Sequence, residues 1–391
     1  MSKSLSYIIV TPYTVAKSRI GGVLSRLLSR LDLEFVGAQM FGADEEFTNA
    51  YADILLSQSD PKNPDAGRLL SEYVRNNFGP TNNKVHRSLL LLFEGEDVYK
   101  KLSDIVGALY PENISTESLQ GETVRDTYAD LIYDPVDYNK VKYFEPAVFT
   151  PRNKQLADNV LTLLSKWLPT QPNIVTNKKG LEEQTLVIIK PENWRFASSK
   201  PGTIIDMFSR TGLKIVGMKL HRMSVQEALN FYQPVEGALK KKLAPSIASK
   251  AKVELERKFD FPLSSKAEEV LVETIGKEYA YDQFEQIIEF MSGYRSTDID
   301  KENLEDPGRV KCFILIYEGK DACKKIREVL GPTDPSKAPE GTVRRDFGRN
   351  IMVNTAHASD SPENAKKEMV IVKAERNRCS YFINEYLKTN K

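Results

Sequence analysis

The residues with the clearest potential for chemistry lie in one short stretch near the end of the chain, residues 354–368. His357 ends a run of β-prone residues. Residues 361–363, Ser-Pro-Glu, then form a helix start, with a hydroxyl cap, a proline at the first helical position and an acid in the first turn. Glu368 follows about two turns later on the same helix face. The stretch therefore predicts an imidazole beside a helix N-terminus, with a carboxylate able to orient it.

Two physical effects give this arrangement a chemical meaning. The N–H groups at a helix N-terminus attract phosphate, and a carboxylate bonded to one ring nitrogen leaves the other nitrogen available for reaction. An ordinary surface histidine in a loop is the alternative interpretation. The order Asn-x-x-His-Ala-Ser-Asp-Ser over residues 354–361 favours the first. It resembles the active-site signature of nucleoside diphosphate kinases at every defined position.

The composition excludes several classes of protein. The chain has 391 residues, which is enough for two hydrophobic cores. Its 55 basic residues balance 54 acidic residues, so no strong charge indicates a nucleic-acid or membrane partner. The hydrophobic content of 41% is that of a soluble globular protein, and no apolar run approaches the length of a membrane span. We therefore expect neither nucleic acid nor a membrane among its partners.

Two features of the sequence, the first residues of the chain and the cysteines, indicate the cellular location of the protein. The short apolar run at residues 7–10 breaks at Thr11 and Pro12, which favours a strand over a signal peptide. The three cysteines show neither the spacing of a metal site nor a disulfide framework. We therefore expect a cytoplasmic protein.

The order of the predicted elements indicates the fold. Residues 7–10 and 33–40 read as strands, and residues 20–31 between them repeat apolar positions at helical spacing. The order β-α-β-(α)-β-α-β predicts a ferredoxin-like sandwich. Its later members are polar helices within residues 44–80, a buried strand at 88–93 and a helix at 98–109.

The same order of strands and helices recurs after a linker near residues 171–182. We therefore predict an internal duplication, with one domain over residues 1–170 and a second over residues 183–391. The matching blocks are Leu-x-x-Val-Gly at 33–37 and 213–217, Glu-Gly-x-Asp at 94–97 and 318–321, and Thr-Val-Arg at 123–125 and 342–344.

The resemblance to nucleoside diphosphate kinases covers about residues 183–373 and implies a role for each site residue. It implies that His357 carries the phosphoryl group, that Ser359 and Glu368 hold its imidazole, and that Tyr232 lies beside it. Arginines suit such a site because they clamp the charge that spreads over a transferring phosphoryl group. The implied nucleotide contacts are Lys190 to the ribose hydroxyls and phosphates, Asn354 to the ribose, and Arg327, Thr333 and Arg344 to the phosphates.

An insertion at roughly 235–280 departs from the family pattern. It is rich in lysine, glutamate and alanine and predicts extra helices, and the lysine run at 240–242 reads as a solvated face. Because the insertion loosens the alignment, Phe284 is the candidate for the ring that stacks on the base, and Tyr281 is the alternative.

The N-terminal domain reads as degenerate. Pro146 aligns with His357, and proline cannot act as a nucleophile. Thr11 stands where the other domain has Lys190, and Arg125 alone remains from the arginine clamp. We therefore predict a structural or regulatory role for this domain.

Together these observations predict an α+β protein with two ferredoxin-like βαββαβ sandwich domains, antiparallel sheets and helical insertions. The resemblance implies a nucleoside diphosphate kinase. Such an enzyme reversibly transfers the γ-phosphate of a nucleoside triphosphate to a nucleoside diphosphate, through ping-pong formation of phosphohistidine at Nδ1 of His357. It also implies Mg²⁺ on the nucleotide phosphates, without a dedicated metal motif. A non-enzymatic nucleotide-binding sensor or scaffold is the alternative.

The resemblance also implies assembly, because nucleoside diphosphate kinases generally form dimers that pair into larger oligomers. We expect a homo-oligomer in which the two domains of one chain make an intrachain pseudo-dimer. The helix at 21–31 and the strand at 33–40 are the contact elements that the resemblance implies. Two independent domains joined by a linker are the alternative.

Overall fold

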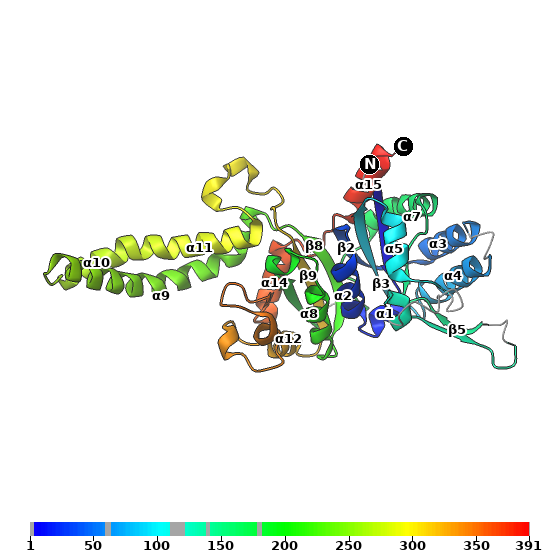
Figure 1. The fold of residues 1–391 in the computed structure, drawn as a ribbon, viewed down its shortest axis with the longest axis horizontal. Helices are drawn as coiled ribbons and strands as arrows, with labels where there is room; N and C mark the ends of the chain where they lie inside the picture. The colour runs from blue at the N-terminus through cyan, green and yellow to red at the C-terminus, as the bar shows by residue number, and fades with distance from the viewer. Residues whose placement is uncertain (1–3, 59–63, 110–121, 138–140, 178–181, 391) are drawn as a thin grey trace. The chain divides into compact units, whose positions relative to one another are not determined.

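An eight-stranded sheet is the centre of the computed structural model, which describes residues 4–58, 64–109, 122–137, 141–177 and 182–390 (Figure 1). The strand order is β10-β7-β9-β8-β2-β3-β1-β6. Each half of the chain contributes four neighbouring strands. From the outer edge of the sheet to its centre, these are the fourth, first, third and second strands of that half. The strands are β1 (Ser4–Val10), β2 (Glu34–Gly42), β3 (Arg87–Gly95), β6 (Val148–Phe149), β7 (Glu183–Ile189), β8 (Lys214–His221), β9 (Cys312–Gly319) and β10 (Ala356–Ala358).

This strand order occurs twice because each half of the chain has the element order βαββαβ. In the N-terminal half, residues 1–170, the two crossover helices are α2 (Ile20–Arg30) and α5 (Val98–Val106). In the C-terminal half, residues 183–391, they are α8 (Lys200–Ser209) and α12 (Ala322–Leu330). The pairs β1–β3 and β7–β9 are antiparallel. The predicted α+β class with two ferredoxin-like sheets is confirmed, whereas an origin by duplication stays a prediction.

The remaining elements are mostly helices. The N-terminal half contains α1 (Pro12–Ala16), α3 (Glu45–Ser57), α4 (Pro64–Asn77), α6 (Val124–Tyr128), α7 (Lys154–Trp167) and the hairpin β4 (Asp130–Tyr133) with β5 (Val141–Glu145). The C-terminal half contains α9 (Val225–Phe259), α10 (Ser265–Leu271), α11 (Lys277–Ser292), α13 (Val343–Phe347), α14 (Pro362–Ile371) and α15 (Cys379–Thr389). Short turns of helix lie at Leu168–Thr170, Pro191–Trp194, Val272–Gly276, Ser296–Asp298, Lys301–Asn303 and Pro335–Lys337.

Corresponding helices in the two halves end in the same way. Gly107 follows α5 with φ 87°, and Gly331 follows α12 with φ 85°. Glycine takes this left-handed conformation without the clash that a Cβ would cause. The room is also limited, because a Cβ at Gly107 would lie 2.2 Å from Oγ1 of Thr123 and one at Gly331 would lie 2.8 Å from Oγ1 of Thr342. Both helices therefore stop at a fixed point and pass the chain toward the short helices α6 and α13.

At the centre of the sheet the two halves meet through a strand pair and a helix pair. Gln39 of β2 pairs with Lys219 of β8 in antiparallel orientation, which joins the two four-stranded sheets. Beside this junction α2 packs on α8 through two glycines. A Cβ at Gly202 would lie 2.3 Å from the carbonyl oxygen of Gly21, and a Cβ at Gly21 would lie 2.6 Å from that of Gly202. The contact therefore runs through the helix and the strand named for an intrachain pseudo-dimer.

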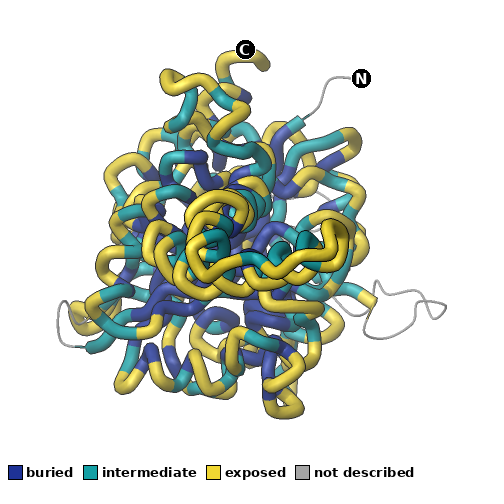
Figure 2. Tube along the Cα trace, turned by 90° about the vertical axis from the view of Figure 1, so that its left-hand side faces the viewer, coloured by how far each residue is buried: buried dark blue, intermediate teal, exposed yellow. Residues whose placement is uncertain are grey.

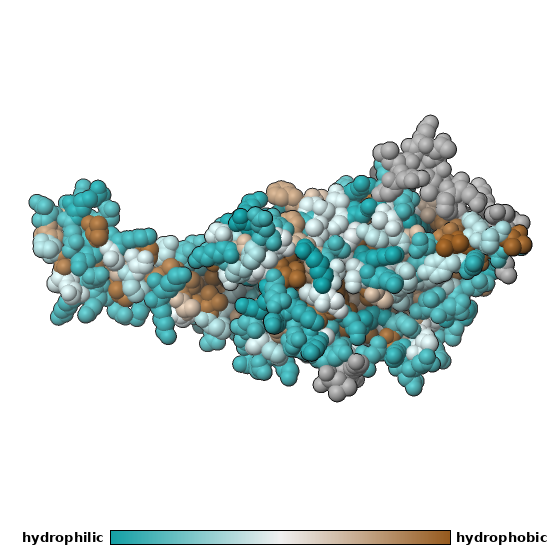
Figure 3. All heavy atoms as spheres, turned by 90° about the horizontal axis from the view of Figure 1, so that it is seen from below, coloured by the Kyte–Doolittle hydropathy of each residue, from teal (hydrophilic) through white to brown (hydrophobic). Residues whose placement is uncertain are grey.

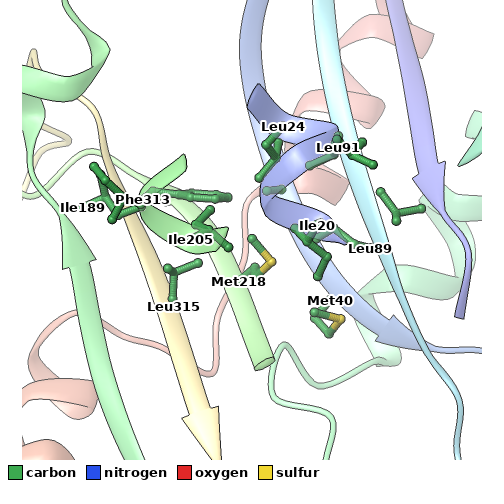
Figure 4. Close-up of a cluster of buried hydrophobic side chains, with 14 of the residues drawn as sticks. Ile20, Leu24, Met40, Leu89, Leu91, Ile189, Ile205, Met218, Phe313 and Leu315 are labelled. Atoms are coloured by element: carbon green, nitrogen blue, oxygen red, sulfur yellow. The ribbon is translucent and has the colours of Figure 1, made fainter. Parts of the chain in front are cut away.

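A single apolar core lies under both helices (Figure 4). Ile20 on α2 and Ile205 on α8 are buried in it, as are Met40 on β2 and Met218 on β8. Burial of apolar surface is the main stabilising term in folding. Since this core takes side chains from both halves, the stability of one half depends on the other.

The last helix of the chain returns to the N-terminal half. Tyr386 of α15 donates a hydrogen bond to Asp158 of α7 at 3.0 Å, and its hydroxyl lies 3.1 Å from that of Tyr99. Asn377, just before α15, donates to the carbonyl oxygen of Ala38 at 2.7 Å. The apolar side of α15 completes a second core, on the sheet face opposite to α2 and α5.

The chain divides into two compact units, which we call unit 1 (Met1–Leu220 with Phe313–Lys391) and unit 2 (His221–Cys312). Unit 2 is a helical hairpin of α9 and α11 joined through α10, and it contains the predicted insertion. Exposed residues run along most of its turns, and its apolar surface residues form separate spots (Figures 2 and 3). The predicted domain boundary at 171–182 stays a prediction, and residues 178–181 lie outside the described residues.

Among the described helices, none has both the length and the apolar character that crossing a membrane requires. Cys312, Cys323 and Cys379 are buried, and no disulfide joins them. Burial raises the pKa of the Cys323 thiol to about 11, which makes that thiol unreactive at neutral pH.

Candidate functional site

His357 lies in the middle of the edge strand β10. The strand pairs with β7 so that His357 is opposite Ile188. Its neighbours Ala356 and Ala358 are buried in the apolar core. Because successive side chains of a strand point to opposite faces, the imidazole points away from that core. The alternation of small apolar residues with histidine therefore turns the ring toward α14.

Helix α14 begins as the sequence predicts. The Ser361 hydroxyl accepts a hydrogen bond from the backbone N–H of Asn364 at 3.2 Å, and Pro362 occupies the first helical position. Glu368 then lies on the face of α14 that looks back at β10. A local signal, the helix cap, thus sets the register that brings Glu368 to the histidine.

His357, Glu368 and Ser359 form one hydrogen-bonded group. Nε2 of His357 lies 3.0 Å from both carboxylate oxygens of Glu368. The Ser359 hydroxyl donates to Oε2 of the same carboxylate at 2.5 Å. The His357 side chain is 24% exposed and that of Glu368 16%. An ionised carboxylate only accepts hydrogen bonds, so it holds the proton on Nε2 and leaves the lone pair on Nδ1.

A second group of predicted residues gathers around a buried lysine. Nζ of Lys190 donates to Oδ1 of Asn354 at 2.6 Å and to the carbonyl oxygen of Met352 at 3.2 Å. Nδ2 of Asn354 in turn donates to the carbonyl oxygen of Thr333 at 3.1 Å. Burial lowers the pKa of Lys190 to about 8, because a buried ammonium loses its hydration. The structure thus holds a titratable cation beside the site.

The backbone between these two groups is strained. Thr355 has φ 80°, a left-handed conformation that is rare for a β-branched residue. Its N–H donates to Oε1 of Glu192 at 2.8 Å, and its carbonyl oxygen accepts from Nδ2 of Asn193 at 2.9 Å. The carbonyl also accepts from the N–H of Lys190 at 2.9 Å. Three hydrogen bonds therefore fix the backbone of Thr355. This fixed turn positions Asn354 before it and His357 after it.

Glu192 and Asn193 hold the backbone of the candidate site, and the sequence did not predict them. Both lie in the short helix Pro191–Trp194 that follows Lys190. The available signal was their position, an acid and an amide within three residues of a predicted site lysine. Both bond the backbone of Thr355, so their role is to position that residue.

The two predicted arginines lie in different surroundings. Arg344 is buried and donates to the carbonyl oxygens of Gly331 and Ala356, each at 3.0 Å. Arg327 is exposed on α12 and lines an open pocket of about 540 Å³ together with Asp360. A hydrogen bond from Asn364, with a smaller contribution from Arg327, lowers the pKa of Asp360. Arg327 is therefore accessible to an anion, while Arg344 braces the backbone beside His357.

Three further predicted residues are Thr333, Tyr232 and Phe284. Thr333 is exposed, and its contribution within the group is its backbone carbonyl. Tyr232 lies on α9 and Phe284 on α11, both in unit 2. Phe284 is 3% exposed and the alternative ring, Tyr281, is 40% exposed. The roles of Tyr232 and Phe284 stay predictions, and Tyr281 is the ring of the two that solvent reaches.

A second histidine–carboxylate pair helps to define what is special about His357. Nε2 of His221 lies 2.7 Å from Oε2 of Glu227. That carboxylate also caps α9, because it accepts from the N–H of Ser224 at 3.1 Å. The side chains of this pair are 12% and 7% exposed. The His221 pair is thus part of a capping box, whereas the His357 side chain is twice as exposed and its carboxylate partner also accepts from a serine hydroxyl.

The N-terminal half has lost the corresponding chemistry, but one detail of the sequence analysis is wrong. Val148 pairs with Val10 as Ala356 pairs with Ile189. This register places Phe149, not Pro146, at the position of His357.

The backbone supports this register. Ala147 has φ 62° and accepts a hydrogen bond from Thr11, just as Thr355 accepts one from Lys190. Pro146 therefore corresponds to Asn354. The alignment slipped because the strand flanks share too few identities, and only the pairing of the edge strand with its neighbour fixes the register. Phenylalanine is no more a phosphate carrier than proline, so the half remains without a nucleophile at this position.

Metal binding would need help from a ligand. Within the described residues, no group of three or more histidine, cysteine, aspartate or glutamate side chains is arranged to hold an ion. Asp360, an exposed carboxylate beside Arg327 in the pocket wall, offers an oxygen ligand of the kind that Mg²⁺ prefers. The donor set fits an ion that arrives with phosphate oxygens of its own.

Comparison with known proteins finds a family model and relatives that match part of the chain. The family model described as nucleoside diphosphate kinase matches residues 183–248 and 273–377. The nucleoside diphosphate kinase of Helicobacter pylori (strain Shi470) is 31% identical over 196 residues, which is 50% of this chain and 98% of that protein. That of a Nitratiruptor species is 30% identical over 194 residues, 50% of this chain and 97% of that protein. A solved structure of the Aquifex aeolicus nucleoside diphosphate kinase is 25% identical, covers 49% of this chain and 94% of its own, and has a TM-score of 0.29.

Proposed function

The chain belongs to the nucleoside diphosphate kinase family, and on that premise we propose that it reversibly transfers the γ-phosphate of a nucleoside triphosphate to a nucleoside diphosphate. The observation that carries this proposal is the group of His357, Glu368 and Ser359, which leaves a lone pair on Nδ1 of a partly exposed imidazole. A nucleophile held in one tautomer by a carboxylate is the usual arrangement for covalent catalysis. The natural partners are then nucleoside triphosphates and diphosphates.

The transfer proceeds in two balanced steps. In the first, Nδ1 of His357 attacks the γ-phosphorus, the new N–P bond forms, and the bond to the β-phosphate oxygen breaks. The nucleoside diphosphate leaves with that electron pair. In the second step an oxygen of another nucleoside diphosphate takes the phosphoryl group, and His357 returns to its starting state. Glu368 stabilises the positive charge that builds on the ring during the attack.

The surrounding cations suit the developing charge. Arg327 is exposed and can approach the phosphates directly, whereas Lys190 and Asn354 are held together at the position proposed for the ribose. Mg²⁺ on the nucleotide phosphates, held on the protein side by Asp360, would neutralise part of the phosphate charge. Assembly into a homo-oligomer and a cytoplasmic location remain predictions.

Labelling of the protein tests the proposal directly. Incubation of the full chain with γ-labelled ATP should give a label that acid removes and base does not, as expected for phosphohistidine. The label should leave on addition of a nucleoside diphosphate. A nucleotide-binding sensor or scaffold would bind ATP in a filter assay and remain unlabelled, which would contradict the proposal.

Glu368→Gln is expected to slow phosphoryl transfer by about tenfold to a hundredfold, since a charge-assisted hydrogen bond is worth about 1.5–3 kcal/mol. Glutamine still accepts a hydrogen bond from Nε2 but cannot stabilise the imidazolium. The loss should appear in kcat more than in KM. Glu363→Gln, on the exposed first turn of the same helix, is the matched control. A change confined to KM would show that Glu368 does not act on the imidazole.

Nucleotide binding above pH 8 is expected to take up a proton. The pKa of free Lys190 is lowered to about 8, and phosphate nearby would raise it again. The same lowered pKa also makes the folding stability of the free protein depend on pH. The unfolded chain binds more protons between pH 8 and the ordinary lysine pKa, so the free protein gains stability as pH rises through that window.

Calorimetry at pH 8.5 in buffers of different ionisation enthalpy measures this uptake. Lys190→Arg should remove the uptake because arginine stays protonated. Lys214→Arg, an exposed lysine on β8, serves as the control and should leave it unchanged. Equal uptake in all three proteins would assign the proton to another group.

A further inference from the structure

The C-terminal end of α14 is held by a buried lysine of the central sheet. Met218 of β8 belongs to the core under α2 and α8, so the side chain of the next residue, Lys219, points to the opposite face of the sheet. There Nζ of Lys219 donates to the carbonyl oxygens of Val372 at 3.1 Å and of Lys373 at 3.0 Å. Lys219 is 5% exposed. Its ammonium thus lies at the end of α14 where the helix dipole attracts a cation.

A short path of hydrogen bonds leads from this lysine to the candidate nucleophile. The N–H of Val372, whose carbonyl oxygen bonds Lys219, donates to the carbonyl oxygen of Glu368 at 3.0 Å. Both carboxylate oxygens of Glu368 in turn lie 3.0 Å from Nε2 of His357. Lys219 therefore holds the residue that closes the last turn of α14, and Glu368 lies in that turn.

The turn that follows α14 has a strained backbone. Lys373 has φ 50°, the left-handed conformation in which the chain usually places glycine after a helix. A residue with a Cβ persists in such a conformation when its surroundings hold it there. The N–H of Ala374 donates to the carbonyl oxygen of Met369 at 2.9 Å, which closes the turn. The hydrogen bond from Lys219 holds the carbonyl group of the strained residue itself.

A buried asparagine holds the same turn. Nδ2 of Asn173 donates to the carbonyl oxygen of Ala374 at 2.7 Å, and Asn173 is 1% exposed. Its Oδ1 accepts from Nδ2 of Asn377 at 2.9 Å. Because buried polar groups are costly unless they are hydrogen-bonded, these side chains and the turn fix each other. We call Lys219 and Asn173 the C-terminal anchor of α14.

We propose that the C-terminal anchor positions Glu368 for phosphoryl transfer; this inference rests on the function proposed above. Ser361 caps the first turn of α14 and the anchor holds its last turn. A helix fixed at both ends cannot slide or rotate, so its carboxylate stays within hydrogen-bonding distance of Nε2 of His357. Lys219 and Asn173 are positioning residues, because they act on the reaction through Glu368.

The N-terminal half takes part in this positioning. Lys219 lies where β8 pairs with Gln39 of β2. Asn377, which bonds Asn173, also donates to the carbonyl oxygen of Ala38 in the same strand. The C-terminal anchor is therefore attached to β2, and a half without a nucleophile helps to hold the carboxylate of the other half in place.

Lys219→Met tests the proposal in the full chain, because methionine has a similar length and no ammonium. The value of kcat should fall about three- to tenfold while KM changes less than about twofold, since Glu368 acts on the imidazolium that forms during transfer. Lys214→Met, an exposed lysine at the start of the same strand, is the matched control. It should leave both constants unchanged.

The same substitution in Glu368→Gln separates positioning from a general loss of structure. If Lys219 acts through the carboxylate, Lys219→Met should lower kcat by less than about twofold in that background. Equal losses in the two backgrounds, or an unchanged kcat in Lys219→Met alone, would overturn the proposal.

Nitrogen NMR of the His357 ring gives a second readout, which does not require phosphoryl transfer. In the unmodified chain the signals should show the proton on Nε2, and in Lys219→Met they should move toward a mixture of both tautomers. If the unmodified chain transfers no phosphate, the proposed function fails and these ring signals alone decide the positioning role. Ring signals unchanged by Lys219→Met would then contradict it.

Asn173→Ala carries the same tests if Lys219→Met does not fold. It removes one hydrogen bond to the turn and leaves the ammonium in place. We expect a fall in kcat of about two- to fivefold, which should again be smaller in Glu368→Gln. The same kcat and the same ring signals as in the unmodified chain would show that the turn after α14 does not position Glu368.

Discussion

His357→Ala is expected to lower the rate of phosphoryl transfer by at least about 10⁴-fold, because removal of a nucleophile leaves only binding and charge stabilisation. Labelling by γ-labelled ATP should disappear with it. The fold should persist, since the imidazole is a quarter exposed and points away from the core. Transfer assays and thermal melting of the same samples separate the two effects.

His86→Ala is the control for this experiment. His86 lies just before β3 and outside the site, so its removal should change neither labelling nor transfer. Because Phe149 occupies the corresponding position in the N-terminal half, no second nucleophile of this kind is available there. Label retained at the unmodified level in His357→Ala would remove His357 as the phosphate carrier.

Gly202→Val is expected to produce the largest loss of stability, about 2–4 kcal/mol in the free energy of unfolding. A Cβ at this position would lie 2.3 Å from both the carbonyl oxygen of Gly21 and the backbone N of Ser25. These are backbone atoms of α2, which cannot rotate away, so the two helices must separate. Denaturant unfolding, with transfer activity as a second probe, measures the loss.

Gly237→Ala is the matched control on an exposed helix. A Cβ at Gly237 meets nothing within 4 Å, and alanine in a helix is more stable than glycine by about 0.5–1 kcal/mol. This variant should therefore be neutral or slightly stabilised. A Gly202→Val protein that unfolds at the same denaturant concentration as the unmodified chain would show that α2 and α8 do not depend on close contact.

These outcomes also bear on why the chain keeps a half without catalytic residues. The junction of β2 with β8, the crossing of α2 with α8 and the return of α15 all bury surface between the halves. If the N-terminal half supports the other by packing, transfer activity in Gly202→Val should be lost at lower denaturant than in the unmodified chain. Independent halves would lose structure separately and leave the activity transition in place.

The sequence alone determined the parts of the site that are close along the chain. His357, the Ser361 cap and Glu368 lie within one strand–turn–helix segment, so helix capping and the 3.6-residue period are enough to predict their meeting. The strands and crossover helices followed from apolar periodicity in the same way. The order of those elements then predicted the ferredoxin-like arrangement of both halves.

Contacts between distant segments were decided by the tertiary structure. Lys190 and Asn354 bond across 164 positions, and the buried environment that lowers the lysine pKa is made by both strands and the loops around them. Glu192 became visible only as the partner of Thr355, whose strained backbone has no sequence signature of its own.

The register of β6 was settled in the same way. The local sequence pattern cannot distinguish a shift of three residues in a short edge strand. The pairing of β6 with β1 was needed to place Phe149 opposite Ile9. Likewise, the closeness of Gly21 and Gly202 is a property of two helices that meet in space. Short-range physics fixes which elements form, whereas register and burial depend on partners that are remote in the chain.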